Sequence, residues 1–225
     1  PPATSGARRR LTGADVVLFL QGAGITLVIS GAAMILAVAG GLGLAMARRS
    51  KRTPLGRLGA VLAAVYVEVV RGTPVLLQLF VIYFGLAPVL ALDAFTAAIL
   101  GLGLNYAAYE AEIYRAGLES VPRGQIEAGL ALGMSEAQVL RRVLLPQALR
   151  VSLPGVTNDF IALLKDSSLV SAITVVELTK RMSITSVDVG SWLVPGALCA
   201  MLYLAMSYPL SRLARRVERR LAAVG

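Results

Sequence analysis

Two aspartates, Asp159 and Asp166, stand seven residues apart in a segment that is otherwise largely apolar. If this segment is a helix, the spacing places both carboxylates within about 20° of each other on one face, with Leu163 between them. Asn158 and Lys165 form a second polar row beside them by the same arithmetic. Ionisable groups are costly in lipid unless they face a partner or a water-filled cavity. We therefore expect this stripe to face a solute pathway.

The charge of the stripe favours a particular kind of solute. Two carboxylates on one face attract a cationic group, so the stripe suits a solute with an ammonium group and a basic side chain as well. Lys165 can neutralise one carboxylate or bind a carboxylate of the solute, and the sequence therefore leaves neutral solutes open. A structural alternative is that Lys165 pairs with Asp159 or Asp166 and simply holds helices together.

Other polar side chains stand inside apolar segments. Asn105 and Gln78 can bind a solute, although an amide within a membrane more commonly forms hydrogen bonds between helices. Glu112 and Arg115 are three residues apart, a spacing that predicts a structural ion pair on one helix.

Several kinds of chemistry are excluded by composition. The chain has no histidine, and its one cysteine, Cys199, lies in an apolar segment where a lone cysteine is usually a small hydrophobic residue. Zinc sites, disulfides and Cys-His nucleophiles are thereby excluded. The sequence also lacks the G-x-x-x-x-G-K-[ST] loop that binds nucleotide phosphates. We expect neither catalysis nor a bound cofactor or metal in this chain.

A charged block at residues 122–146 separates two apolar segments and predicts two short helices with a defined joint. Gly133 can adopt the left-handed conformation that ends a helix. Ser135 is a good N-cap, Gln138 completes a capping box, and Glu136 stands where the helix dipole favours an anion. Pro146 is expected to close the block.

The spacing of this block resembles the EAA signature, E-A-A-x3-G-x9-I-x-L-P, of ABC importer permeases. Two positions depart from the signature, because Gly129 replaces the third alanine and Val143 replaces isoleucine. In that family the block is the coupling helix that docks into the ATPase subunit. The resemblance therefore implies an ATPase-coupling role for Glu127, Ala128, Gly129, Gly133, Leu145 and Pro146.

Three further strings narrow the resemblance. Residues 71–84, 105–115 and 165–169 resemble the RGTPxLxQLFxxYF, LNxxAYxAEIxR and KDTSL strings of the polar amino-acid uptake permeases, which include histidine, arginine, glutamine and cystine importers. The similarity extends over residues 14–215. It implies a polar amino acid as substrate, for which the candidate binding residues are Asp159, Asp166, Leu163, Asn105, Gln78 and Ser168.

The elements that position these residues are expected to be membrane helices. Hydrophobic residues make up 56% of the chain, charged residues only 16%, and the mean hydropathy is +0.73, values that are hard to reconcile with a soluble domain. Three uncharged runs, 16–47, 72–92 and 189–211, each reach the roughly 20 residues that span a bilayer as a helix.

Two more spans are expected at 94–115 and 151–173, although charged residues interrupt both. These charges must face protein or lie at the membrane boundary. Leu58–Val70 is only about 20 Å long as a helix, too short to cross, and is expected along the cytoplasmic face. The sequence thus predicts an all-α integral membrane protein with five transmembrane helices, and the resemblance to ABC importer permeases implies the type I ABC importer (MetI-like) fold.

Lysine and arginine set the orientation, because positively charged short loops stay in the cytoplasm. Five spans with an outside N-terminus place the clusters at 48–57, 123–150 and 212–220 on one side. Arg8, Arg9, Arg10, Lys180 and Arg181 then lie outside. The net charge of +9 is explained by this topology. Nucleic-acid binding is the rival interpretation, but no aromatic-basic binding module accompanies the charges.

One membrane domain is expected. We assign residues 1–21 to an N-terminal tail with an external interfacial helix capped by Thr12 and Asp15, residues 22–215 to the transmembrane domain, and residues 216–225 to a cytoplasmic tail. Small residues in the first span favour close packing, which we expect against the rest of a dimer; they are Gly31, Ala32, Ala33, Ala37, Ala39, Gly40, Gly41 and Gly43.

The leading hypothesis is a permease subunit of a polar amino-acid importer in a bacterial inner membrane. The resemblance implies a second permease subunit, identical or a sister chain, two ATPase subunits with ATP and Mg, an extracytoplasmic binding protein, and membrane lipid as partners. A passive channel or secondary carrier is the alternative, but it leaves the EAA block unexplained. A scaffold for membrane partners is a third, for which the buried aspartates would have no use.

Overall fold

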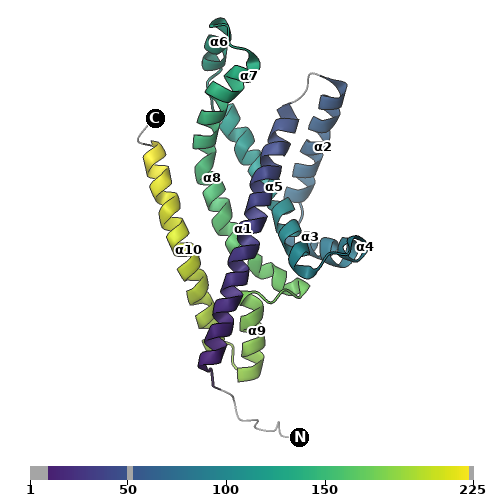
Figure 1. Cartoon of the computed structure of the whole chain (residues 1–225), viewed down its shortest axis with the longest axis vertical. Helices are drawn as coiled ribbons and strands as arrows, with labels where there is room; N and C mark the ends of the chain where they lie inside the picture. The colour runs from purple at the N-terminus through teal and green to yellow at the C-terminus, as the bar shows by residue number, and fades with distance from the viewer. Residues whose placement is uncertain (1–9, 50–52, 223–225) are drawn as a thin grey trace.

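The computed structural model describes residues 10–49 and 53–222, with side chains to residue 219. This part of the chain is all-helical, as predicted. Four long helices form its body: α1 (Gly13–Arg49), α5 (Ala94–Glu119), α8 (Leu145–Asp166) and α10 (Leu193–Ala222). They run along the long axis of the molecule, and the C-terminus lies toward the end that carries α6 and α7 (Figure 1).

Helix α1 is a single element of 37 residues. The separate interfacial helix expected before residue 22 is continuous with the span, because neither Gly22 nor Gly24 breaks the helix. Gly22 instead permits close packing, since a Cβ there would lie 3.1 Å from the Cα of Leu178. The expected cap is present, with the backbone N–H of Thr12 donating to the Asp15 carboxylate at 2.8 Å.

The segment expected along the cytoplasmic face forms a longer helix with a different position. Helix α2 (Pro54–Arg71) begins at Thr53, whose hydroxyl accepts from the backbone N–H of Gly56 at 3.0 Å. It packs against α1 and α5, and Val67 is fully buried against Ala108 and Ala111 of α5. The expectation was wrong because α2 runs alongside α1 (Figure 1), where it buries Ala60, Ala63 and Val67 while larger apolar residues such as Leu62 stay exposed.

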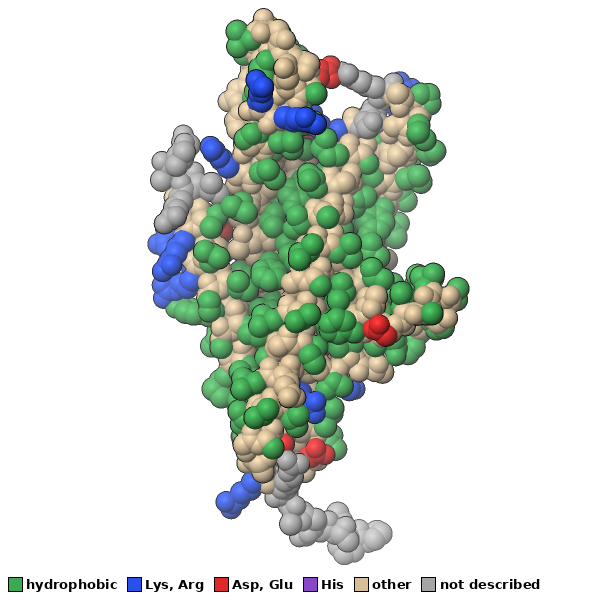
Figure 2. Space-filling view, in the orientation of Figure 1, with side chains coloured by type: hydrophobic (Ala, Val, Ile, Leu, Met, Phe, Trp, Pro, Cys, Tyr) green, Lys and Arg blue, Asp and Glu red, His purple; other side chains and the backbone are tan. Residues whose placement is uncertain are grey.

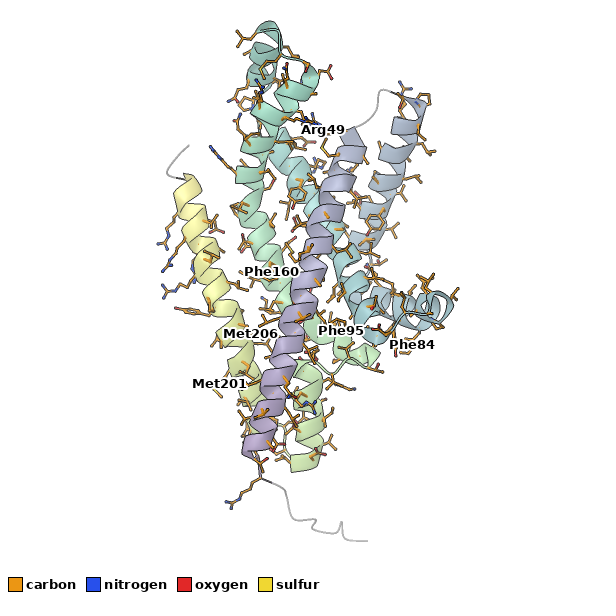
Figure 3. The ribbon with its side chains drawn as sticks, in the orientation of Figure 1. Arg49, Phe84, Phe95, Phe160, Met201 and Met206 are labelled. Carbon is orange, nitrogen blue, oxygen red and sulfur yellow. The ribbon has the colours of Figure 1, made fainter. Side chains whose placement is uncertain are left out.

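A sharp bend follows α2. The helices over Val75–Leu90 are α3 (Val75–Phe80), the π-helical segment η1 (Val81–Leu86) and α4 (Ala87–Leu90), and this stretch turns by 108° from α2. It projects from the body as an arm on which Phe84 is 61% exposed (Figures 1 and 3). Proline and glycine explain the bend, because Gly72 ends α2 and Pro74 precedes α3.

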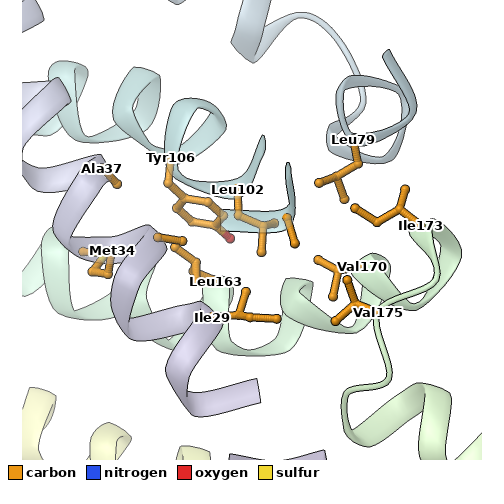
Figure 4. Close-up of a cluster of buried hydrophobic side chains, with 12 residues drawn as sticks. Ile29, Met34, Ala37, Leu79, Leu102, Tyr106, Leu163, Val170, Ile173 and Val175 are labelled. Carbon is orange, nitrogen blue, oxygen red and sulfur yellow. The ribbon is translucent and has the colours of Figure 1, made fainter. Parts of the chain in front are cut away.

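The hydrophobic core lies where α1, α3, α5 and α8 meet. Leu102 of α5, Leu163 of α8 and Ile29 of α1 are fully buried there, and Tyr106 of α5 packs among them (Figure 4). Close helix contact depends on glycine, since a Cβ at Gly41 would lie 2.4 Å from the Cβ of Glu110 on α5. The small-residue stripe of α1 therefore packs at this point against α5 of the same chain.

After α8, the 3-10 helix η3 (Ser167–Ile173) leads to α9 (Leu178–Val189) at the end of the molecule opposite α6 and α7 (Figure 1). Glu177 caps α9, accepting from the backbone N–H groups of Lys180 at 2.7 Å and Thr179 at 2.8 Å. The Tyr203 hydroxyl donates to the same carboxylate at 3.1 Å. Glu177 is fully buried and joins α9 to α10.

The charged block folds at the other end. It consists of α6 (Arg123–Ala131), α7 (Glu136–Val139) and the π-helical segment η2 (Leu140–Leu144), which continues into α8. Val139 and Leu144 are buried with Leu118 and Val121 at the end of α5. The block is thus packed against the long helices rather than hanging from a loop.

Helix α1 and the residues Leu193–Arg219 of α10 are long and apolar enough to cross a membrane, and the bent pair Pro54–Arg71 and Val75–Leu90 is a third candidate among the described residues. The two interrupted spans correspond to α5 and α8. Hydrophobic side chains cover the middle of the molecule, and basic side chains gather toward the α6–α7 end (Figure 2). Arg8, Arg9, Lys51 and Arg52 lie outside the described residues.

Candidate functional site

A cavity of ≈ 300 Å³ lies where the α2–α3 bend meets α5 and α8. Three of the residues singled out by sequence, Asn105, Asp159 and Asp166, line it. Its remaining walls come from Thr73, Pro74, Val75, Tyr106, Tyr109 and Ala162. The volume stands at the lower end of the range for small-molecule sites, which suits a compact polar solute.

The two aspartates have different surroundings. Asp166 accepts a hydrogen bond from the Tyr106 hydroxyl at 2.8 Å. Asp159 has a buried Oδ2 atom without a hydrogen-bond partner among the described residues. A buried carboxylate oxygen without a donor is costly, so Asp159 is the group in this cavity that most needs a ligand.

Arg71 contributes positive charge beside this cavity. Its guanidinium lies over the Tyr109 ring, 5.4 Å from the ring centroid, and its charge acts on Asp159. Arg71 therefore offsets part of the negative charge of Asp159 beside the cavity.

Gln78 holds the bend together. Its side-chain amide donates to the Val70 carbonyl at 2.8 Å and to the Thr73 hydroxyl at 2.8 Å, and its carbonyl accepts from the Asn105 amide at 3.0 Å. Gln78 therefore positions Asn105 and is not among the residues that line the cavity. The Thr73 hydroxyl donates to the Val69 carbonyl at 2.9 Å and so closes the end of α2.

Leu163, Lys165 and Ser168, which the sequence also singled out, do not line the cavity. Leu163 is fully buried in the core, and Ala162 occupies the cavity wall. Ser168 is half-buried in η3, and Lys165 is exposed. The structural alternative was an ion pair between Lys165 and one of the aspartates. The described residues contain no such pair, and Asp166 instead accepts a hydrogen bond from Tyr106.

The charged block forms the predicted pair of helices. Gly133 has φ +79°, the left-handed conformation, and separates α6 from α7. The predicted capping box is present: the Gln138 backbone N–H donates to the Ser135 hydroxyl at 3.3 Å, and the Ser135 N–H donates to the Gln138 side chain at 2.7 Å.

Within this block the signature residues divide into exposed and packed positions. Glu127 and Ala128 are exposed, as is Leu132 beside them, which is 83% accessible. Gly129 is buried, and a Cβ there would lie 3.1 Å from Cγ2 of Val139. The glycine in place of the signature's third alanine thus lets α6 approach α7, while Glu127, Ala128 and Leu132 face outward.

Pro146 does not close the block as expected. Helix α7 continues through η2, and Pro146 lies in the first turn of α8 next to Leu145. Proline fits there because it lacks an N–H, and the wide π-helical turn before it accommodates the missing hydrogen bond. The chain therefore connects the block to the aspartates of α8 through continuous helical structure.

The predicted ion pair is part of a larger network. Arg115 donates to Glu112 at 2.8 Å and to Glu119 at 2.6 Å. Arg48 of α1 also pairs with Glu112. This network connects α1 to α5 close to the charged block.

Sequence reasoning missed the two tyrosines and the bend residue Thr73 as parts of the cavity. Tyr106 and Tyr109 belong to the quoted string at 105–115, and Thr73 to the string at 71–84, so the signal was present without an assigned role. The sequence did not reveal that the α2–α3 bend brings residues of the 71–84 string against α5 and α8.

An all-helical chain with an acidic cavity between membrane helices, and with a packed helix pair at one end, has the architecture of a transport permease. A family model described as the inner membrane component of binding-protein-dependent transport systems matches residues 39–223. The chain belongs to this family and is an inner-membrane permease component of an ABC transporter.

Similar proteins agree with this assignment. The chain is 44% identical to the L-cystine transport system permease protein TcyB of Bacillus subtilis (strain 168), over 79% of this chain and 75% of that protein. It is 39% identical to the glutamine transport system permease protein GlnP of Escherichia coli (strain K12), over 80% of this chain and 84% of that protein.

Solved structures show the same fold. A crystal structure of an amino acid ABC transporter with histidines matches with a TM-score of 0.83 and 35% identity, over 94% of this chain and 100% of that chain. The inward-facing MetNI methionine ABC transporter matches with a TM-score of 0.81 at 20% identity, over 94% of this chain and 99% of that chain. The predicted type I ABC importer fold is thereby confirmed.

Over the described residues, no group of three or more Cys, Asp or Glu side chains is placed to hold a metal ion.

Proposed function

We propose that this chain carries a polar amino acid across the bacterial inner membrane, with ATP hydrolysed in separate ATPase subunits. The single observation that supports the substrate site is the unpartnered Oδ2 of Asp159 in the ≈ 300 Å³ cavity. An α-ammonium group of an amino acid would supply the missing donors and neutralise the carboxylate. The cystine, glutamine and arginine permeases among the relatives have names that agree with this class of solute.

Each lining residue then has a role. Asp159 binds the ammonium group, Asn105 offers an amide held in place by Gln78, and Tyr106 fixes Asp166. Arg71, which lies over the Tyr109 ring, adds a positive charge beside the cavity, where a substrate carboxylate finds a favourable field. A site with both charge signs suits a zwitterion better than a simple cation.

The α6–α7 pair is proposed as the surface that binds the ATPase subunit. A mechanical coupling element needs an exposed contact and a rigid connection to the moving helices. Glu127, Ala128 and Leu132 supply the exposed contact, and the buried cluster around Val139 and Leu144 supplies the connection. Motion of this pair is transmitted along α8, which carries Asp159 and Asp166.

The proposed assembly contains two permease subunits, either identical or paired with a sister chain, two ATPase subunits and an extracytoplasmic binding protein. The basic residues at the α6–α7 end support a cytoplasmic location for that end, because positively charged short loops stay in the cytoplasm. Helix α9, at the opposite end, then faces the side from which the binding protein delivers the amino acid (Figure 1).

The test is uptake in liposomes that contain the assembled complex. We expect uptake of radiolabelled cystine, glutamine or arginine only when ATP is enclosed with the ATPase subunits and binding protein is present outside. Omission of ATP, or of the binding protein, should reduce uptake to the level of empty liposomes. Equal uptake by the permease without ATP or ATPase subunits would contradict the proposal and support a passive channel or secondary carrier.

A further inference from the structure

The cytoplasmic half of α10 carries a basic surface that the proposed function does not use. We define the α10 stripe as Tyr208, Arg212, Arg215 and Arg219, all of which are exposed. At 100° per residue these four side chains lie within about 60° of one another around the helix. Ala214, which is only 2% exposed, marks the opposite side, where α10 packs against the body.

The four side chains of the α10 stripe surround one cavity. A cavity of ≈ 500 Å³ is lined by its four members and Glu218. The Arg212 guanidinium donates to the Tyr208 hydroxyl at 2.8 Å and 2.5 Å, and its carbon lies 5.1 Å from the centroid of the Tyr208 ring. Arg219 donates to the Arg215 carbonyl at 3.1 Å. These contacts hold two of the three guanidinium groups in fixed positions.

The charge of the stripe is not neutralised by the protein. None of its three arginines forms an ion pair with an acidic side chain in the described part of the chain. Like charges three or four residues apart on a helix destabilise it, and one glutamate beside three arginines leaves a net positive cavity. An anion with several oxygen acceptors would relieve this repulsion.

The helix face changes character along its length. Leu204 and Met201, about one and two turns before Tyr208, lie on the same side of α10 by helix geometry. They are 63% and 61% exposed, and Figure 3 shows Met201 on α10. An exposed apolar surface followed by an aromatic ring and then arginines matches the sequence of environments from acyl chains to headgroups in one membrane leaflet. A free anion would make no use of the apolar part of this surface.

We propose that the α10 stripe binds the headgroup of an anionic phospholipid in the cytoplasmic leaflet, whose acyl chain lies against Leu204 and Met201. The phosphate contacts Arg212 and Arg215, while Tyr208 holds Arg212 at the headgroup level. This site is independent of the amino-acid cavity, since α10 contributes no residue to that cavity.

The test is native mass spectrometry of the purified transporter complex titrated with phosphatidylglycerol or, separately, with phosphatidylcholine. We expect phosphatidylglycerol to be retained more strongly. Arg212→Gln and Arg215→Gln should each weaken that retention about fivefold, the factor expected for one arginine near an anionic surface. Arg216→Gln is the matched control, because this arginine lies about 70° from the middle of the stripe and does not line the cavity. It should change retention by less than about twofold.

Two results would overturn the proposal. Equal retention of the two lipids by the unaltered complex, or equal loss in Arg212→Gln and Arg216→Gln, would show that the stripe has no lipid specificity. If Arg212→Gln instead released an ATPase or permease subunit without changing lipid retention, the stripe would be a protein-docking surface. Size-exclusion profiles of the variants verify that each complex remains assembled before the titration.

Discussion

The hydroxyl of Tyr106 on α5 donates a hydrogen bond to the carboxylate of Asp166 on α8, with 2.8 Å between the two oxygens. This bond joins two helices across the wall of the acidic cavity and satisfies one of the two aspartates. Asp159 lies seven residues before Asp166 on the same face of α8, and its Oδ2 atom has no hydrogen-bond partner among the described residues. The cavity thus holds one aspartate already fixed by the protein and one available to a solute.

Removing the Tyr106 hydroxyl tests whether this bond positions Asp166. We expect Tyr106→Phe to raise the half-saturating substrate concentration for uptake by about three- to tenfold. This corresponds to about 0.7–1.4 kcal/mol, the net contribution of a typical hydrogen bond, because Tyr106 acts on the solute through Asp166. Tyr66→Phe is the control, because the half-buried Tyr66 donates its hydroxyl to the Leu104 carbonyl at 2.7 Å and does not line the cavity. Equal effects of the two substitutions on liposome uptake would argue against a role for Tyr106 in the cavity.

The contact between α1 and α5 predicts opposite effects at two neighbouring glycines. Gly41→Ala should lower the free energy of unfolding by at least about 1–3 kcal/mol, because the Cβ of the new alanine would overlap the side chain of Glu110. Gly43→Ala should be neutral or stabilise by about 0.5–1 kcal/mol, since a Cβ there meets no atom within 4 Å. Thermal unfolding in detergent measures both, and similar stability of the two variants would contradict the packing.

A substitution that strains the joint at Gly133 should impair coupling to the ATPase subunits while the protein still folds. Gly133→Val should leave the protein in the membrane but abolish substrate-stimulated ATPase activity, because a β-branched residue is strained at φ +79°. Gly133→Asn should retain most of the stimulation, since asparagine tolerates the left-handed conformation. Full stimulation in the valine variant of the reconstituted complex would exclude a coupling role for the joint.

The buried carboxylate of Glu177 predicts a structural role at the opposite end. Glu177→Gln should destabilise the protein by about 1.5–3 kcal/mol, because the amide cannot accept all the hydrogen bonds that the carboxylate receives from Thr179, Lys180 and Tyr203. Glu119→Gln changes a side chain that is 63% exposed and should have a smaller effect on the melting temperature. Equal shifts in both variants would mean that Glu177 does not anchor α9.

Much of this structure is encoded locally and was predictable. The Gly133 joint and the Ser135–Gln138 capping box depend on residues within one or two turns, and both are present as predicted. The helical stripe of Asp159 and Asp166 also follows from spacing alone.

The features that could not be predicted depend on distant segments. The position of α2 is set by its contacts with α1 and α5, and the wall of the cavity is set by a 108° bend that brings Thr73 toward Tyr106. The continuous course of α7 into α8 depends on a π-helical turn before Pro146, for which the sequence has no local signature. Leu163 was placed correctly on its helix, but α1 and α5 pack around it and remove it from the cavity.

The central claim is that Asp159 binds the ammonium group of the transported amino acid. The most direct measurement is the concentration dependence of ATP-driven uptake by Asp159→Asn in liposomes, with Asp188→Asn, an exposed aspartate at the end of α9, as the matched control. We predict a ten- to hundredfold rise in the half-saturating concentration for Asp159→Asn, which corresponds to loss of about 1.5–3 kcal/mol, with basal ATPase activity retained and no change in the control. Unchanged uptake kinetics in both Asp159→Asn and Asp166→Asn would show that the aspartate stripe is structural and would contradict the account.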